Sequence, residues 1–276
     1  MSRIRQISNE IIPPVMKKSV STLWRRIKGD AGSLRPDERF PKAIAAPKGN
    51  PKSLGYVVGD PIVTVPVERV RYPDGRGYTP DEHHFLKYYE AGLDSLRSFY
   101  DSHQPQNVFE FFGIEASETV NVEGYDPPWF DHTASVGKSG EKGLTPDDGN
   151  QAFGPVSERK LRLEAARLDH VLSSIQTQGF RPEIGGHVRG YFMHRTNGEW
   201  VFVVREGFHR TAALVQLGFD EIDVRFVRGY PRFVEETDSA EWPLVKNALV
   251  TERAALAMFS RFFDEKRDHS LDLKNI

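Results

Sequence analysis

The residues best placed to do chemistry lie between an apolar run and a helix, in the segment 205–214, which reads REGFHRTAAL. The preceding residues 200–204 are all apolar and predict a strand buried on both faces. Gly207 would let the backbone turn sharply, and the first N–H groups of the following helix would then face an anion. His209 and Arg210 add donors that suit phosphate oxygens. This spacing predicts a phosphate-binding loop, although it also fits a helix start that is merely covered by surface cations.

A helix is predicted upstream of this loop, because apolar residues recur there at helical spacing. It follows Ser157, a favourable N-cap, and stops at Gly179. Its apolar face consists of Leu161, Ala165, Leu168, Leu172 and Ile175.

The remaining elements around the loop are predicted from turn signals and alternation. Asn197-Gly198 is typical of a tight hairpin and would join an extended segment at 187–195 to the strand at 200–204. After the loop, residues 211–217 predict a helix that stops at Gly218, and residues 220–227 alternate as a strand. The predicted order is therefore helix, hairpin, loop, helix and strand.

This order, together with three short motifs, resembles the superfamily of ParB N-terminal domains and sulfiredoxins. Its members bind nucleotide phosphates on the corresponding loop. ParB proteins carry GERR there and use CTP, sulfiredoxins carry GCHR and use ATP, and the free-serine kinases carry DGHHR; this chain has EGFHR. The motifs that carry the resemblance are Ser174-Ile175 with Gly179-Phe180, the run from Val203 to Gly218 around Gly207-x-His209-Arg210, and Ile222-x-Val224.

The resemblance implies an α+β fold, with a ParB/sulfiredoxin-like nucleotide-binding domain, a preceding helical module and a C-terminal helix. Sulfiredoxin activity is excluded, because Phe208 stands in place of the nucleophilic cysteine and the chain contains no cysteine. The kinase branch fits better, since Glu206 occupies the place of the aspartate in DGHHR. The resemblance then implies an ATP-dependent phosphotransferase for a small hydroxyl substrate, with ATP or CTP and Mg²⁺ as cofactors.

The resemblance also implies roles for residues of the loop. Gly207, His209, Arg210 and Thr211 are expected to hold the phosphates. Glu206 is expected to be the catalytic base or a metal ligand, because a carboxylate beside bound phosphates can hold magnesium or accept a hydroxyl proton. The alternative for Glu206 is a solvated carboxylate paired with a neighbouring arginine.

Three residues on the segment after the first helix are secondary candidates, since the superfamily places active-site groups there. Glu183 is a second catalytic candidate, and Arg189 and His187 are candidates for contacts with the substrate. The pair His83-His84 is not favoured as a metal site, because adjacent residues on a helix point about 100° apart.

Two other classes of function stay open. One is a non-catalytic, nucleotide-gated binding or scaffold protein whose closure changes its contacts with a partner. The other is a phosphodiesterase or nuclease, which ranks lowest because the sequence shows no further cluster of carboxylates or histidines for a two-metal site. A DNA-binding role is not favoured, since 37 Lys and Arg residues balance 39 Asp and Glu residues and the net charge is −2.

Composition predicts a cytoplasmic protein. Hydrophobic residues make up 38% of the 276 residues, and no stretch approaches the roughly 18 apolar residues of a membrane span. Residues 1–54 are expected to form a basic amphipathic helix followed by a proline-rich linker. The helix at 15–28 could lie on the inner membrane surface, dock on an acidic protein partner or pack on the domain beside it.

The rest of the chain is divided by composition into four further segments. Residues 55–130 predict a small mixed helical module, with a helix capped by Thr79, and residues 131–156 predict a flexible loop that is also a candidate lid. Residues 157–230 form the ParB/sulfiredoxin-like domain, and residues 231–276 a helical extension. The aromatic run 127–130 is expected either to pack on the core or to line the substrate pocket.

A looser likeness extends over the whole chain, to ParB-like proteins encoded beside bacterial cell-envelope polysaccharide enzymes. It depends on the loop motif, on GPVS at 154–157 and on WPLVKN at 242–247. By association, it implies a role in polysaccharide biosynthesis.

Overall fold

The computed structural model describes residues 44–45, 51–56, 59–114, 124–130 and 143–264. The described residues all belong to one compact unit of mixed α and β structure, so the α+β class is confirmed. The predicted basic helix at 15–28 and most of the candidate lid at 131–142 lie outside the described residues.

One mixed sheet holds all seven described strands, and its order is β1-β2-β6-β4-β5-β3, with β7 paired to β4. Antiparallel pairs join β2 to β6 and β4 to β5, whereas β1 with β2, β6 with β4, β7 with β4 and β3 with β5 are parallel. The strands are β1 (Ile44–Ala45), β2 (Val63–Pro66), β3 (Val70–Arg71), β4 (Val188–His194), β5 (Trp200–Glu206), β6 (Glu221–Phe226) and β7 (Phe233–Glu235).

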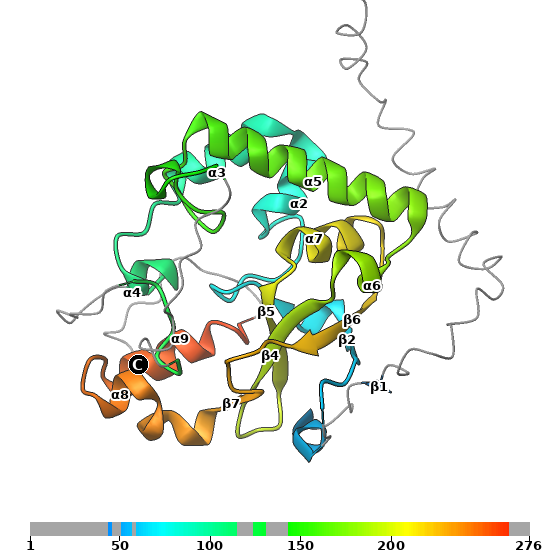
Figure 1. Cartoon of the computed structure of the whole chain (residues 1–276). Coiled ribbons are helices and arrows are strands. Elements are labelled where there is room, and N and C mark those ends of the chain that lie inside the picture. Colours follow the sequence, from blue (N-terminus) through cyan, green and yellow to red (C-terminus); the bar gives the residue numbers. More distant parts are fainter. Residues whose placement is uncertain (1–43, 46–50, 57–58, 115–123, 131–142, 265–276) are drawn as a thin grey trace, which may run out of the picture. The chain divides into compact units, whose positions relative to one another are not determined.

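Helices cover both faces of this sheet (Figure 1). On one face lie α2 (His84–Ala91), α3 (Leu93–Ser102), α5 (Glu158–Gln178) and α7 (Phe208–Gln216). On the other lie α4 (Val108–Phe111), α8 (Pro243–Lys246) and α9 (Glu252–Ser260). The short α6 (Pro182–Gly185) leads into β4, and 3₁₀ turns occur at Pro51–Tyr56, Val67–Arg69, Pro146–Asp148 and Glu236–Glu241.

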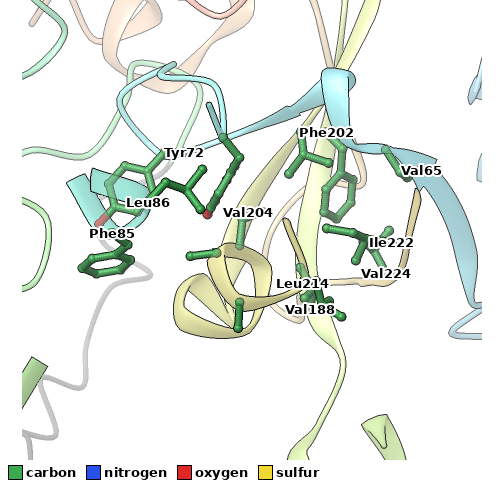
Figure 2. Packing of buried hydrophobic residues seen from close by; sticks show 14 of the residues in the cluster. Val65, Tyr72, Phe85, Leu86, Val188, Phe202, Val204, Leu214, Ile222 and Val224 are labelled. Carbon is green, nitrogen blue, oxygen red and sulfur yellow. The ribbon is translucent and has the colours of Figure 1, made fainter. Parts of the chain in front are cut away.

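Strand β5 separates two hydrophobic cores. Its residues 200–204 are all buried, as predicted, and alternate residues face opposite sides, so Phe202 and Val204 join one core while Val201 and Val203 join the other. Figure 2 shows the first core, to which Val204 of β5 and Leu214 of α7 both contribute. The loop between β5 and α7 is thus fixed at both ends by buried side chains.

The elements predicted around the loop are confirmed. Ser157 caps α5 by accepting a hydrogen bond from the Lys160 backbone N–H, and Gly179 ends the helix with φ +76°. Gly198, with φ +90°, makes the turn between β4 and β5. The strand expected at 220–227 is β6, and Thr251 caps α9 through its side chain.

Two predicted helix starts are wrong. The helix expected after Thr79 begins instead at His84, because Glu82 accepts a hydrogen bond from the Gly77 backbone N–H at 2.8 Å and so closes a turn. Helix α7 begins at Phe208 rather than at 211, because Gly207 itself is the N-cap.

The predicted segment boundaries do not separate cores. Strands β2 and β3 of the segment 55–130 belong to the same sheet as β4, β5 and β6. In the aromatic run 127–130, Trp129 and Phe130 are 4% exposed and pack in the second core, which is the first of the two arrangements expected for this run. Among the described residues, no helix combines the length and apolarity that a membrane crossing requires.

Candidate phosphate-binding site

The backbone at Gly207 has the form expected of an anion-binding loop. Its φ is +93°, in the left-handed region that favours glycine, and it forms the N-cap of the nine-residue helix α7. Because glycine has no side chain, the first-turn N–H groups of α7 receive no side-chain cap from Gly207. These groups and the positive end of the helix dipole are therefore available to an anion.

A β-bulge places Glu206 beside this turn. Arg189 of β4 pairs with Glu206 and the next residue, Gly190, pairs with Val204, so Arg205 is the extra residue of β5. The Glu206 side chain is 57% exposed, and its carboxylate lies 3.9 Å from Arg189 Nε. An exposed carboxylate at the edge of the turn can accept a proton or contribute one ligand to a cation.

Arg210 folds back over the turn and holds the segment that precedes β4. Its guanidinium donates to the backbone carbonyls of Gly185 and His187, the latter at 3.2 Å. It also packs against Gly207, where an added Cβ would lie 3.0 Å from Arg210 Nη2. Burial lowers the pKa of this guanidinium, and the nearby Glu206 carboxylate partly offsets that effect. Arg210 stays charged at neutral pH, so it contributes positive charge at the turn.

The His209 side chain reaches a buried ion cluster on α5. Its Nε2 lies 2.6 Å from Glu164 Oε2, and its ring stacks on Phe85 at 4.9 Å. The other Glu164 oxygen accepts from Lys160 and Arg167, each at 2.8 Å. Glu164 and Lys160 are almost completely buried. Burial alone would raise the pKa of Glu164, but the hydrogen bonds and charges of His209 and Lys160 lower it to about 2.

Thr211 is fully buried, and its hydroxyl donates to the Gly207 carbonyl at 3.1 Å. This bond stabilises the first turn of α7. The assignment of Thr211 to phosphate contacts stays a prediction, and so do those of His209 and Arg210, whose side chains already have protein partners.

The substrate candidates Arg189 and His187 lie at the same edge of the sheet as Glu206. Arg189 donates to the Phe226 carbonyl at 2.8 Å and to Asp60 Oδ2 at 3.1 Å. Burial lowers the pKa of the half-buried His187 side chain, and Arg225 and Arg189 lower it further. Cationic side chains from two neighbouring strands, Arg189 of β4 and Arg225 of β6, therefore lie near His187 at this edge of the sheet.

Glu183, the second catalytic candidate, lies on α6 and is paired with Arg181 at 3.4 Å. Its helix is tied to the loop through the bond from Arg210 to Gly185. No contact between the Glu183 side chain and Glu206 or Gly207 is seen, so its catalytic role stays a prediction.

Three side chains of the site were not singled out from the sequence. Glu164 falls on the apolar stripe of α5, between Leu161 and Leu168, and a carboxylate at such a position signals a buried ion pair. Arg225 shares one face of β6 with Asp223, which the alternation could have shown. Asp60 gave no signal, because its partners are 129 and 165 residues away in the sequence.

Within the described residues, no group of three His, Asp or Glu side chains is arranged to hold a metal ion. Glu206 offers a single carboxylate, which fits Mg²⁺ that is held mainly by nucleotide phosphates and water. The His83 and His84 rings stack in the core, and His84 lies 3.3 Å from Arg76 Nη1 through Nδ1 and 3.2 Å from the Gln151 carbonyl through Nε2.

The chain matches no protein-family model, and comparisons with curated proteins and with solved structures returned no similar protein.

Proposed function

We propose that this protein binds a nucleotide by its phosphates at the loop 206–211 and transfers a phosphoryl group to a small hydroxyl compound. The observation that carries the proposal is the left-handed Gly207 turn at an uncapped helix start, flanked by the exposed Glu206 carboxylate and the guanidinium of Arg210. Backbone N–H groups and guanidinium groups together stabilise phosphate charge, whereas a surface cation alone gives little binding.

The arrangement of elements supports membership of the superfamily of ParB N-terminal domains and sulfiredoxins. Helix α5, the β4–β5 hairpin, the loop, α7 and β6 follow one another in the order that the resemblance implies. The loop departs from the ParB motif at Phe208 and His209. We therefore place the protein nearer to the kinases of that superfamily than to its CTP-dependent members.

The proposed reaction needs few groups. The acceptor hydroxyl oxygen attacks the terminal phosphorus, the bond from that phosphorus to the bridging oxygen breaks, and the nucleoside diphosphate leaves. Glu206 accepts the hydroxyl proton, while Arg210 and the first N–H groups of α7 stabilise the charge on the phosphoryl oxygens. Mg²⁺ bound with the nucleotide would neutralise further phosphate charge.

A second candidate is a nucleotide-gated binding protein, for example one that acts beside enzymes of surface polysaccharide synthesis. It is favoured by the partners of His209 and Arg210, which tie the loop to α5 and to the segment before β4. A ligand that draws either side chain toward a phosphate would loosen those ties. Binding could then change the position of α5 or α6 without any turnover.

Nucleotide binding is tested by thermal unfolding of the full chain with ATP, CTP, ADP and GTP, each with and without Mg²⁺. A ligand at about 100 times its dissociation constant should add about 2.7 kcal/mol of stability to the wild type. Arg210→Ala should remove this gain. Arg195→Ala is the matched control, because Arg195 is also partly buried and paired with one carboxylate, Glu199, at 3.2 Å. If no nucleotide stabilises the wild type, the proposal is wrong.

Turnover separates the two candidates. With the nucleotide identified, hydroxyl compounds are screened for acceptor-dependent release of the nucleoside diphosphate. Glu206→Gln should keep nucleotide binding and lose roughly a hundredfold or more in turnover, as expected for a general base. A Glu206→Gln protein with full turnover would exclude Glu206 as the base. Nucleotide binding without any turnover would favour the gated binding protein.

A further inference from the structure

Two arginines on neighbouring parallel strands converge on one carboxylate oxygen. Arg189 of β4 and Arg225 of β6 are register partners. Their Nη1 atoms lie 3.1 Å and 3.2 Å from Asp60 Oδ2. Both arginine side chains are 21% exposed and Asp60 is 30% exposed, so the group lies at the edge of the molecule and is accessible to a solute.

Asp60 satisfies this pair of guanidinium groups incompletely. Each guanidinium has several donors in a planar fork, yet each gives Asp60 a single hydrogen bond, and both bonds go to the same oxygen. The Asp60 Oδ1 and Arg225 Nε atoms are buried and have no hydrogen-bond partner among the described residues. An oxyanion with two or three free oxygens would match these donors better than one carboxylate oxygen does.

The charge around the pair also favours an anion. The charges of Arg225 and Arg189 lower the pKa of the neighbouring His187 more than the carboxylates of Asp60 and Asp223 raise it. Positive charge therefore dominates around this histidine. Arg210 adds a third guanidinium nearby, and its buried Nε is likewise without a hydrogen-bond partner within the described part of the chain. Asp60 is hydrogen-bonded to both strand arginines, whereas the exposed Glu206 carboxylate lies 3.9 Å from Arg189 Nε.

We propose that Arg189 and Arg225 form a binding site for a phosphate or carboxylate group, and that Asp60 occupies this site as an internal competitor when no ligand is bound. The site lies beside the nucleotide loop, since Arg189 also faces Glu206. If the proposed phosphotransferase function holds, the acceptor is an anionic hydroxyl compound whose charged group binds this pair. The anion site itself does not depend on that function.

Competition between Asp60 and a bound anion is tested by titrating the full chain with inorganic phosphate and, separately, with acetate. The ionic strength is held constant with sodium chloride. Asp60→Asn should bind the preferred anion about tenfold more tightly than the wild type, because the competing carboxylate is gone. Arg225→Gln should lose binding. Asp126→Asn and Arg195→Gln are matched controls, since each removes one member of a partly buried ion pair elsewhere. If the Asp60→Asn variant binds neither anion more tightly than the wild type does, the proposal is overturned.

A measurement on the wild type covers the case in which a variant does not fold. In protein labelled with ¹⁵N-arginine, phosphate should shift the Nε–H signal of Arg225, because that donor gains a partner. An unchanged signal at saturating phosphate would overturn the proposal. The phosphate and acetate titrations show which of the two anionic groups the site prefers.

Repeating the titration with saturating ATP and Mg²⁺ separates this proposal from the nucleotide proposal. If phosphate still binds in the presence of ATP, and its affinity still depends on Asp60 and Arg225, the acceptor site is distinct from the nucleotide site. If ATP displaces phosphate from both the wild type and Asp60→Asn, phosphate occupies the nucleotide site and the proposal of a distinct site is overturned. If ATP does not bind at all, the nucleotide proposal fails, while the titrations without ATP still decide the anion site.

Discussion

His209 Nε2 lies 2.6 Å from Glu164 Oε2 and joins the first turn of α7 to the N-terminal half of α5. An ionised carboxylate only accepts hydrogen bonds, so the shared proton is on His209 Nε2. Glu164 also binds Lys160, which is 1% exposed. The first turn of α7 is therefore held by a buried ion cluster on α5.

Glu164→Gln should be strongly destabilising. The substitution keeps the size of the side chain but leaves the buried Lys160 ammonium without its carboxylate, and breaking a buried pair costs roughly 3 kcal/mol or more. Urea unfolding at neutral pH measures this loss. Glu158→Gln is the control on the same helix, because Glu158 is solvent-exposed in its pairs with Arg97 and Arg162, and the midpoint should hardly move. Equal unfolding midpoints for the two variants would contradict the conclusion that Glu164 stabilises the fold through a buried ion pair.

The same carboxylate should make stability depend on pH in the acid range. The pKa of Glu164 is about 2 in the folded chain, against 4.5 for an unperturbed glutamate, so its contribution is complete above pH 4.5 and is lost as the pH falls toward 2. By linkage the loss amounts to about 3 kcal/mol. The stability difference between the wild type and Glu164→Gln should therefore shrink as the pH falls through this range. If the stability difference between the two proteins stays constant with pH, the Glu164 carboxylate is not the cause of the acid-range loss of stability.

Gly207→Ala should cost more stability than Gly198→Ala. Both glycines have φ near +90°, so both substitutions carry a backbone penalty of roughly 1–2 kcal/mol. At Gly198 a new Cβ meets nothing within 4 Å, whereas at Gly207 it would lie 3.2 Å from Val188 Cα and close to Arg210. The difference between the two variants in free energy of unfolding, measured with urea, gives the cost of the close contacts that a Cβ at position 207 makes with Val188 and Arg210. Equal losses would show that the loop can accept a side chain.

Arg210→Lys should loosen the segment before β4. A lysine ammonium keeps the charge but lacks the fork that reaches both the Gly185 and His187 carbonyls. Amide hydrogen exchange over residues 182–187 should become faster, while exchange in α9 stays the same. Unchanged exchange at 182–187 would mean that Arg210 does not hold this segment and is free to serve a ligand alone.

His84 should remain neutral well below its usual titration range. Burial lowers the pKa of its imidazole, and Arg76 lowers it further. Arg76 can only donate, so His84 Nδ1 accepts and the proton is on Nε2, which faces the Gln151 carbonyl. Because the unfolded chain binds this proton near pH 6.5, the contribution of His84 to stability is present above that pH and falls below it. Long-range ¹H–¹⁵N spectra should show the neutral Nε2–H form in the folded chain at pH values where urea-unfolded chain is protonated.

The elements around the loop could be predicted from the sequence because their signals are local. Ser157 and Gly179 delimit α5, and Asn197-Gly198 makes the hairpin, each through contacts within a few residues. The helix expected at Thr79 failed for a related reason. The pattern of a cap with Glu82 three residues later was present, but Glu82 binds the Gly77 N–H and the chain turns before the helix begins.

The site was predicted only in part, because its partners come from distant segments. Gly207 and Glu206 were found from their neighbours in sequence. The acceptors of His209 and Arg210 were not, since Glu164 is 45 residues away and Gly185 is 25 residues away. Asp60 reaches the site only because β2 pairs with β6 and β6 pairs with β4. Such pairing depends on the whole sheet, and a single sequence does not specify it locally.

The Gln151 carbonyl accepts hydrogen bonds from Tyr100 at 3.1 Å and Tyr72 at 3.5 Å, besides its contact with His84. At the other end of the preceding segment, Phe130 is buried in the second core. Residues just before Gln151 add contacts of their own, because Asp148 accepts hydrogen bonds from the Ser157 N–H and hydroxyl and Asn150 Oδ1 accepts one from the Ala152 N–H. The described part of this connection, residues 143–150, is therefore tied to the start of α5, and a peptide inserted there would disturb the cap of that helix.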